Sequence, residues 1–182
     1  ASIMFFDIRG STTMAEKIGP QAYAERISKL FADLMDIIFN NGGSINELLV
    51  DGILATFGCP FPKSDDAENA VRAALAIESH MNSINRLREI AGKVPYGFGM
   101  GISTGKIFAG NIGSERMIKF AVMGDSVNTA ARIQDLTKDS PYNIIIDEPT
   151  RAAGKPACSV TELETTQLRG KQESVKLFGL KE

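Results

Sequence analysis

Histidine and cysteine are scarce in this sequence. Its 182 residues include one histidine, His80, and two cysteines, Cys59 and Cys158, which lie far apart. Zinc motifs and disulfide frameworks need several such residues at short, regular spacings, so both are excluded. We interpret the two cysteines as small core or surface residues in a reduced, cytoplasmic setting, and the sequence assigns no role to His80.

The sequence also lacks an excess of charge and a long apolar run. Lys and Arg total 20 against 22 for Asp and Glu, a net charge of −2, so no charge excess attracts nucleic acid or an anionic membrane. No apolar stretch approaches the roughly 18 residues that a membrane-spanning helix requires. Hydrophobic residues make up 43% and charged residues 23%, as in ordinary globular proteins. We expect no nucleic-acid partner and no membrane contact by this chain.

The length and the first residues indicate how the chain is organised into domains. A chain of 182 residues is most simply one domain, which we predict to span residues 1–182. The sequence begins with Ala-Ser-Ile rather than Met and runs directly into an apolar stretch. We therefore interpret it as a fragment of a longer protein that is cytoplasmic, or held at the cytoplasmic face of a membrane by a preceding part.

Apolar patterns predict a mixed α and β fold. Runs of strand length occur at residues 3–8, 44–49, 53–57, 96–103, 142–146, 159–163 and 175–180. Helical spacing or capping residues predict helices at residues 13–19, 23–39, 65–90 and 125–136. The order strand, helix pair, hairpin, helix, strand predicts an α+β fold with a ferredoxin-like βαββαβ core and C-terminal additions.

This topology predicts two contacts between segments that are distant in the sequence. In a ferredoxin-like fold the third strand runs antiparallel beside the first, so Asp7, near the end of strand 3–8, should face Asp51, which precedes strand 53–57. The strand at residues 96–103 alternates glycine with apolar residues (YGFGMGIS). That alternation predicts that another backbone or helix approaches the strand closely.

The pair Asp7 and Asp51 indicates metal chemistry. Two adjacent carboxylates repel each other, and a divalent cation between them relieves the repulsion. The neighbouring segment 8–13 supplies backbone N–H groups at the start of a helix, an arrangement suited to a triphosphate. Together these features fit a two-metal phosphoryl-transfer site. From the residues alone an alternative stays open, in which Asp7 caps the helix and Asp51 is a turn residue.

Four segments resemble the catalytic domain of class III nucleotidyl cyclases. They are FFDIRGST at residues 5–12, the hairpin Asp51, GISTGKIFAGNIGSERM at residues 101–117 and VMGDSVNTAARI at residues 122–133. Four motifs in the right order over most of the chain make a specific signal. The resemblance implies a class III cyclase-like fold and an enzyme that converts a nucleoside triphosphate to a cyclic nucleotide and pyrophosphate.

The resemblance implies metal ligands and transition-state residues. It makes Asp7, Asp51 and the backbone of Ile8 the ligands of two Mg²⁺ or Mn²⁺ ions, which activate the ribose 3′-hydroxyl for attack on the α-phosphate and hold the departing pyrophosphate. It makes Asn128 the residue that orients the ribose and Arg132 the residue that neutralises the α-phosphate. These two lie four residues apart on one helical face, which without the resemblance would be interpreted as a solvated face.

The resemblance also implies an assembly and a set of phosphate-binding residues. In the family the metal aspartates and the remaining site residues lie on different faces of the domain, so a symmetric homodimer with two shared sites follows. The triphosphate is assigned to Arg9, Gly10, Ser11 and Thr12. It is also assigned to Arg169, in a segment (LRGK) similar to the family's Lys-Gly-Lys, for which a surface charge run is the alternative.

Base selection is implied by Glu47 and Ala121. Adenylyl cyclases of this family carry Lys at the position of Glu47 and Asp or Thr at that of Ala121, whereas guanylyl cyclases carry Glu and usually Cys. A carboxylate only accepts hydrogen bonds, so Glu47 suits the N1–H and N2–H₂ donors of guanine. Ala121 offers no donor to guanine O6. The first choice is therefore a guanylyl cyclase that acts on GTP, and the alternative is an adenylyl cyclase acting on ATP or an enzyme of mixed specificity.

The sequence departs from the family pattern at two residues, and two other functions are disfavoured. Val50 stands where the family has Gly, which questions the hairpin geometry because a β-branched residue resists positive φ. Ser11 stands where the family has Phe. A silent nucleotide-binding regulatory module is disfavoured by the retention of the metal and transition-state residues. A diguanylate cyclase or a polymerase palm is disfavoured by the absence of a Gly-Gly-Asp-Glu-Phe-type turn.

Overall fold

The computed structural model describes residues 1–164 and 174–181 and has the predicted α+β fold. Its main sheet has seven strands in the order β2-β3-β1-β4-β7-β9-β8, and β5 and β6 form a separate two-stranded hairpin. The strands are β1 (Ser2–Arg9), β2 (Gly43–Leu48), β3 (Gly52–Phe57), β4 (Gly97–Thr104), β5 (Phe108–Ser114), β6 (Met117–Met123), β7 (Ile144–Asp147), β8 (Ser159–Glu162) and β9 (Leu177–Lys181). The helices are α1 (Ser11–Ile18), α2 (Pro20–Asn40), α3 (Asp66–Ile90), α4 (Asp125–Leu136) and α5 (Glu148–Gly154), and a 3₁₀ turn, η1, covers Thr137–Asp139.

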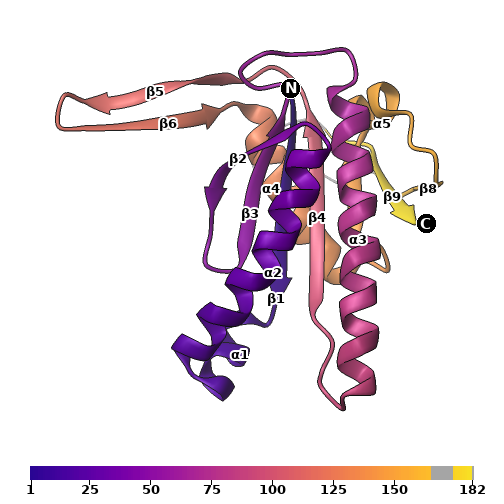
Figure 1. The fold of residues 1–182 in the computed structure, drawn as a ribbon. Helices are drawn as coiled ribbons and strands as arrows, with labels where there is room; N and C mark the ends of the chain where they lie inside the picture. The colour runs from indigo at the N-terminus through magenta and orange to yellow at the C-terminus, as the bar shows by residue number, and fades with distance from the viewer. Residues whose placement is uncertain (165–173, 182) are drawn as a thin grey trace.

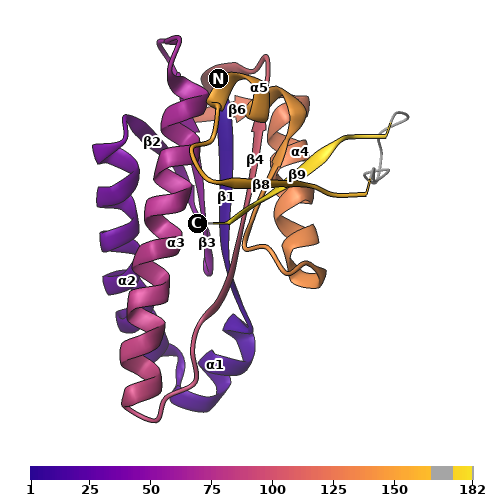
Figure 2. The same ribbon diagram turned by 90° about the vertical axis from the view of Figure 1, so that its right-hand side faces the viewer.

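The ferredoxin-like core is present as the element order predicted. The order β2-β3-β1-β4 places β1 between β3 and β4, and both neighbours run antiparallel to it. Figures 1 and 2 show α2 and α3 on one face of the sheet and α4 on the other. β7 extends the core as a parallel neighbour of β4, and the antiparallel strands β9 and β8 follow.

Alternate residues of β1 serve the two faces of the sheet. Met4, Phe6 and Ile8 are buried in the large core beneath α2 and α3, whereas Ile3 is buried on the α4 side against Leu54 and Ala130. Because side chains alternate along a strand, Asp7 shares the α4 side with Ile3. The alternation of buried residues along β1 thus directs the side chain of Asp7, a predicted metal ligand, to the α4 side of the sheet.

The predicted close approach to the glycine-rich strand occurs along α4. A Cβ atom on Gly101 would lie 2.3 Å from both the carbonyl oxygen of Ala130 and the backbone nitrogen of Gln134. Only a residue without a side chain lets the α4 backbone pack this closely on β4. The glycine therefore sets the distance between α4 and the sheet.

The β5–β6 hairpin is the main element that the sequence analysis missed. Its strands pair from Phe108 with Met123 to Ser114 with Met117, and it projects from the body of the domain (Figure 1). Strand prediction depends on one buried face, and no residue of this hairpin is buried. The short helix α5, which Asp147 caps through a hydrogen bond from the Thr150 N–H, was also missed.

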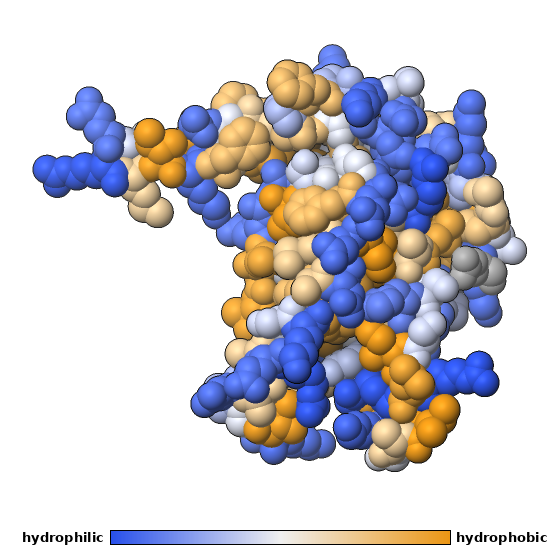
Figure 3. All heavy atoms as spheres, viewed as in Figure 1, coloured by the Kyte–Doolittle hydropathy of each residue, from blue (hydrophilic) through white to orange (hydrophobic). Residues whose placement is uncertain are grey.

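Exposed apolar side chains gather on this hairpin, as the space-filling view shows (Figure 3). They include Phe108 at 53% exposure and Met117 at 74%. A cluster of large apolar groups on a projecting element is typical of a surface that meets another protein. Among residues 1–164 and 174–181, no helix has the length and apolar character needed to cross a membrane.

We expect Gly101→Ala to lower the free energy of unfolding by about 1 to 3 kcal/mol, because the added methyl group would overlap the α4 backbone. Chemical denaturation measures this loss. Gly97→Ala is the matched control in the same strand and should cost less, since a Cβ there would lie 3.1 Å from the Cβ of Arg9, whereas a Cβ on Gly101 would lie 2.3 Å from backbone atoms. Equal losses for the two variants would show that α4 does not depend on Gly101.

Candidate active site

The pairing of β1 with β3 brings Asp7 and Asp51 together. Asp7 lies opposite Gly52 in the antiparallel register, and the Ile8 N–H donates to the Asp51 carbonyl at 2.9 Å. A Cβ on Gly52 would lie 3.6 Å from Oδ1 of Asp7, so the Asp7 carboxylate extends toward the residue that follows Asp51. The predicted juxtaposition of the two acidic residues is present in the structure.

This arrangement is electrostatically unfavourable without a cation. Burial, and next the negative charge of Asp51, raise the pKa of Asp7 to about 6. Asp135 raises it further, while Lys138 and Arg9 oppose the shift. A half-buried carboxylate whose pKa is raised by burial and by a second carboxylate is enriched at functional sites.

The donor set fits Mg²⁺ or Mn²⁺. Carboxylate oxygens are the hard ligands that these ions prefer, and such ions are commonly held by one or two carboxylates together with substrate phosphates and water. Within residues 1–164 and 174–181, no cluster of three or more His, Cys, Asp or Glu residues could hold a metal by itself. The remaining ligands of a metal held by Asp7 and Asp51 would be the predicted backbone ligand Ile8, water or oxygens of a bound substrate.

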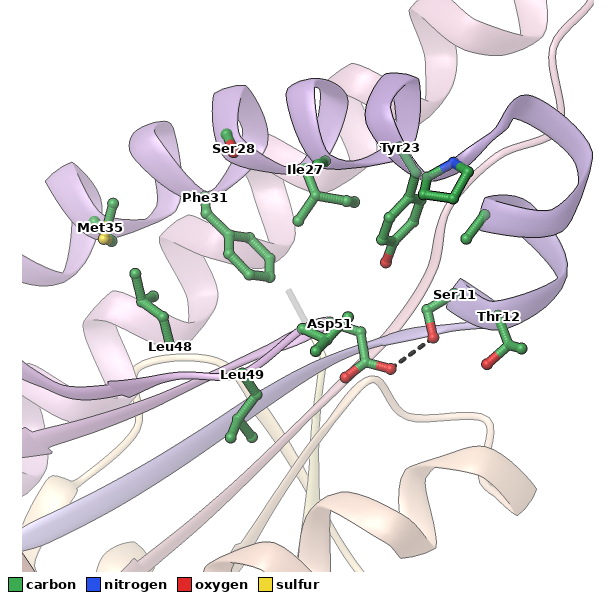
Figure 4. A pocket seen from close by; sticks show the side chains of 14 residues that line it. Ser11, Thr12, Tyr23, Ile27, Ser28, Phe31, Met35, Leu48, Leu49 and Asp51 are labelled. Carbon is green, nitrogen blue, oxygen red and sulfur yellow. Dashed lines mark hydrogen bonds between the residues drawn. The ribbon is translucent and has the colours of Figure 1, made fainter.

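The turn from β1 to α1 lies against the aspartates. Gly10 adopts a φ of +70°, the left-handed conformation that favours glycine. The hydroxyl of Ser11 donates to Oδ2 of Asp51 at 2.6 Å (Figure 4), and Thr12 lines the same cavity as both residues. Val50 adopts no positive φ, because Lys155 alone does so among the non-glycine residues that the structure describes. The concern about the hairpin geometry is thus removed.

The side chain of Arg9 extends toward the 3₁₀ turn η1. Its Nη2 donates to the carbonyl of Thr137 at 2.6 Å, which ties the end of β1 to η1. Burial lowers the pKa of its guanidinium, and the carboxylates of Asp7 and Asp139 oppose that effect. In the structure Arg9 therefore braces the sheet beneath α4, and its assignment to the triphosphate stays a prediction.

Glu47 lies at the outer edge of the sheet, where it meets the projecting hairpin. A bulge between Ile45 and Glu47 interrupts the pairing of β2 with β3. Glu47 Oε1 accepts from Lys119 Nζ of β6 at 2.7 Å, with side-chain exposures of 44% and 58%. Ala121 lies two residues further along β6, so its side chain lies on the same face of the hairpin as Lys119.

Lys119 is the partner of the predicted base-reading residue Glu47 that the sequence reasoning missed. The usable signal was its alternation with Ala121 in the segment KFA, which requires that residues 117–123 be a strand. Since that strand was not predicted, the link between Glu47 and Lys119 could not be drawn. The structure thus adds a donor next to the proposed base-reading acceptor.

Asn128 and Arg132 lie on the outer side of α4. The buried residues of this helix, which pack toward the sheet, are Ser126, Thr129, Ala130, Ile133 and Gln134. Helical periodicity places Asn128 and Arg132 on the side opposite these residues. Neither side chain forms a hydrogen bond or ion pair with another residue of the described ranges. They face away from Asp7, which lies on the sheet beneath the helix.

The structure describes both cysteines but not Arg169. Arg169 lies in residues 165–173, outside the described residues. Cys59 and Cys158 are both partly exposed and are not joined in a disulfide. The absence of a disulfide framework, expected from the spacing, holds for the described part of the chain.

A cavity of about 820 Å³ adjoins the two aspartates. It lies between α1, α2 and the turn from β2 to β3, and Figure 4 shows the side chains that line it. Ser11 and Asp51 form one end, near Tyr23, whose pKa is raised by burial and next by the charge of Asp51. The sequence analysis predicted the apolar face of α2 but no cavity beside it, because most of that face was expected to be covered.

The sequence of this chain matches a known protein family. Residues 1–182 match the family described as the adenylate and guanylate cyclase catalytic domain. The chain belongs to the adenylyl and guanylyl cyclase family. The resemblance of the four sequence motifs is thereby confirmed, and so is the expected fold.

Solved structures of both activities resemble this cyclase domain. The guanylyl cyclase Cya2 has a TM-score of 0.87 and 31% identity, over 98% of this chain and 90% of that one. The adenylyl cyclase CyaB from P. aeruginosa has a TM-score of 0.89 and 25% identity, over 100% and 93% of the two chains. The fold is thus shared by enzymes named for different nucleotides.

Curated relatives extend well beyond this domain. Adenylate cyclase 1 of Rhizobium meliloti is 26% identical over 175 residues, 96% of this chain and 26% of that protein. An uncharacterized protein of Mycobacterium tuberculosis is 30% identical over 179 residues, 97% of this chain and 32% of that protein. The chain therefore spans about a quarter to a third of the length of these relatives.

The raised pKa of Asp7 predicts how the metal-free domain responds to pH. A carboxylate with a raised folded-state pKa binds its proton more tightly in the folded protein, so its contribution to stability is present at acidic pH and is lost as pH rises to about 6 and above. We expect Asp7→Asn to raise the free energy of unfolding at pH 8 by about 1 to 2 kcal/mol, allowing for solvent screening.

Denaturant titrations at pH 4 and pH 8 in chelator measure this effect. The gain of Asp7→Asn should shrink toward zero at pH 4, where Asp7 is protonated in the folded state. Asp36→Asn, which removes an exposed carboxylate from α2, serves as the control and should change stability little at either pH. A gain of the same size at both pH values would contradict the raised pKa of Asp7.

Proposed function

We propose that this domain is a guanylyl cyclase that converts GTP to cyclic GMP and pyrophosphate. The observation that carries the proposal is the ion pair between Glu47 and Lys119, 2.7 Å apart, next to Ala121. Guanine presents one acceptor, O6, followed by two donors, N1–H and N2–H₂. The ammonium of Lys119 and the carboxylate of Glu47 offer a donor followed by acceptors, which is the complementary order.

The same pair is mismatched to adenine. Adenine presents a donor at its exocyclic amine and an acceptor at N1, so Lys119 would meet the donor and Glu47 would meet the N1 lone pair. Buried polar groups left without partners cost about 1 to 3 kcal/mol each. Lys119 also supplies a hydrogen-bond donor for guanine O6, which Ala121 cannot do because its side chain has no polar group.

The proposed reaction uses the acidic residues at the ends of β1 and β2–β3 together with two residues of α4. Two divalent cations at Asp7, Asp51 and the Ile8 backbone would lower the pKa of the ribose 3′-hydroxyl and neutralise charge on the triphosphate. Asn128 orients the ribose, and the guanidinium of Arg132 neutralises the charge that develops on the α-phosphate. The N–H groups at the start of α1, in residues Gly10 to Thr12, face the β- and γ-phosphates.

We further propose that the active site forms between two copies of this chain. Asn128 and Arg132 lie on the side of α4 that faces away from the sheet, so they cannot meet a nucleotide held at Asp7 of their own chain. The exposed apolar side chains of the β5–β6 hairpin provide a surface for a second copy. A two-fold homodimer satisfies both observations, because each chain then completes the other's site.

Product identification after incubation with Mn²⁺ and GTP or ATP tests the substrate. We expect cyclic GMP and a preference for GTP. Lys119→Met should lower kcat/KM for GTP by about tenfold or more, because it removes a charged hydrogen bond to O6. With 6-thio-GTP, whose sulfur is a weak acceptor, the loss should be much smaller.

Arg116→Met is the matched control, because it removes a positive charge from the turn of the same hairpin. It should leave the ratio of GTP to 6-thio-GTP unchanged. A wild-type preference for ATP would overturn the guanylyl assignment and indicate an adenylyl cyclase. Equal losses for GTP and 6-thio-GTP would show instead that Lys119 acts only by orienting Glu47.

Mixing two inactive variants tests the shared site. Asp7→Ala and Arg132→Ala should each be inactive alone, and their mixture should recover activity because one of the two sites in a mixed dimer is intact. The activity of the wild type per chain should also fall on dilution. Mixed dimers that form, as shown by differently tagged chains, but stay inactive would place the whole site within one chain.

A further inference from the structure

A basic pocket lies between α2 and α3, on the face of the sheet opposite to the α4 side that carries Asp7. Figures 1 and 2 show the end of α3 and the turn to β4 at the end of the domain where α2 begins. The pocket has a volume of about 250 Å³ and is lined by Arg26, Lys29, Leu30, Asp33, Ile84, Arg88, Lys93 and Tyr96. Four of these residues are basic and one is acidic, although the whole chain has a net charge of −2. Positive charge is thus concentrated here.

The guanidinium of Arg88 is held in one orientation. Its central carbon lies 3.9 Å from the centre of the Tyr96 ring, and its Nε donates to the carbonyl of Val94 at 2.8 Å. Asn85 fixes the backbone of Tyr96 in turn, because its side chain accepts from the Tyr96 N–H at 2.7 Å and donates to the Tyr96 carbonyl at 2.9 Å. A ligand that meets this guanidinium therefore loses little free energy in ordering it.

The other donors of the pocket are available to a ligand. Neither Nη atom of Arg88 has a hydrogen bond or ion pair with the residues that the structure describes, and neither is enclosed by protein. The charged groups of Arg26, Lys29 and Lys93 likewise have no carboxylate partner within the described ranges. Guanidinium groups bind phosphate oxygens through paired N–H groups, and ammonium groups add positive charge. This donor set is that of a phosphate-binding site.

Asp33 is the one acidic residue among the described residues that line the pocket. Its Oδ2 lies 3.3 Å from Nε2 of His80 on α3, so a protonated imidazole would offset its charge. With a neutral imidazole, the carboxylate repels an anion in the pocket. Removal of this carboxylate should therefore strengthen anion binding, whereas removal of a basic residue should weaken it.

The volume and the charge favour a compact anion. Pockets for drug-sized ligands measure roughly 300 to 1,000 Å³, so a pocket of about 250 Å³ does not enclose a nucleoside together with its phosphates. Leu30 and Ile84 add apolar surface beside the basic groups, and apolar surroundings strengthen the attraction between opposite charges. Four basic groups suit a ligand that carries several negative charges.

We propose that this pocket binds a small polyvalent phosphate anion, for which inorganic pyrophosphate is the probe. Two N–H groups of Arg88 bind oxygens of one phosphate, and Lys29 and Lys93 neutralise the remaining charge. The binding does not depend on the proposed cyclase reaction, because none of these residues belongs to the proposed active site.

Isothermal titration calorimetry with sodium pyrophosphate measures the binding. The buffer contains chelator, because divalent cations would hold pyrophosphate at Asp7 and Asp51. We expect one pyrophosphate per chain, an affinity that falls as sodium chloride is added, and weaker binding of GDP. Tighter binding of GDP than of pyrophosphate would overturn the choice of a compact free anion, and an absence of binding at low salt would overturn the site.

Two arginines of α3 provide a matched pair of variants. Arg88 lines the pocket and Arg86 does not, although both lie near the end of the same helix. Arg88→Gln should weaken pyrophosphate binding by about tenfold or more, because it removes two charge-assisted hydrogen bonds. Arg86→Gln removes the same charge and should change the affinity little. Equal losses in the two variants would show attraction to general surface charge and would overturn the site.

Two aspartates of α2 test the pocket with substitutions at exposed positions, so the test holds even where Arg88→Gln does not fold. Asp33→Asn should strengthen pyrophosphate binding by about threefold, because it removes the carboxylate of the lining. Asp36→Asn removes an exposed carboxylate that does not line the pocket and should change the affinity little. An equal gain in both variants, or none in Asp33→Asn, would contradict binding beside Asp33.

Nuclear magnetic resonance locates the bound anion. We expect pyrophosphate to shift the backbone amide signals of Lys93, Val94 and Tyr96 in the turn before β4. The chelator is present here as well, so the measurement reports the protein without divalent cations. Shifts confined to residues 10–12 would place the anion at the start of α1, beside Asp51, and would overturn the site between α2 and α3.

Discussion

The antiparallel pairing of β1 with β3 is the constraint on which the site depends. It places Asp7 opposite Gly52, next to Asp51, and holds the two acidic residues together through the Ile8 N–H. The core supplies the energy for this, since Met4, Phe6 and Ile8 are buried beneath α2 and α3 while Asp7 faces the other side. Burial of Asp7 and its repulsion by Asp51, which raise the pKa of Asp7 to about 6, are thus imposed by hydrophobic burial elsewhere on the same strand.

The packing of α4 separates the predicted transition-state residues, Asn128 and Arg132, from the predicted metal ligands, Asp7 and Asp51. Gly101 admits the α4 backbone so closely that the helix has one face fully committed to the sheet. Asn128 and Arg132 are consequently directed outward, as are Lys119 and Glu47 at the projecting hairpin. A domain built in this way presents its predicted metal ligands and its other predicted site residues in different directions, which supports the proposal that the active site forms between two chains.

Much of this arrangement could be predicted from the sequence, because it follows from patterns with a buried side. The apolar run in residues 3–8 and the element order placed Asp7 beside Asp51, and the glycines of residues 96–103 predicted the close approach of another backbone, which the structure shows to be that of α4. The β5–β6 hairpin has no buried residue, so its strands and the role of Lys119 left no such pattern. Long-range charge pairs such as Glu47 with Lys119, 72 positions apart, are visible only once the fold exists.

Ser11 connects the features that distinguish this chain from the family pattern. The family has Phe at this position, and a phenyl ring there would occupy space at the end of the cavity and could not donate a hydrogen bond. In this chain the small serine leaves that end open, and its hydroxyl donates to Asp51 at 2.6 Å. Serine at this position therefore constrains the carboxylate of Asp51, which is one member of the proposed metal pair. A phenylalanine could not hold that carboxylate by a hydrogen bond, so the orientation of this proposed ligand depends on a residue that differs from the family pattern.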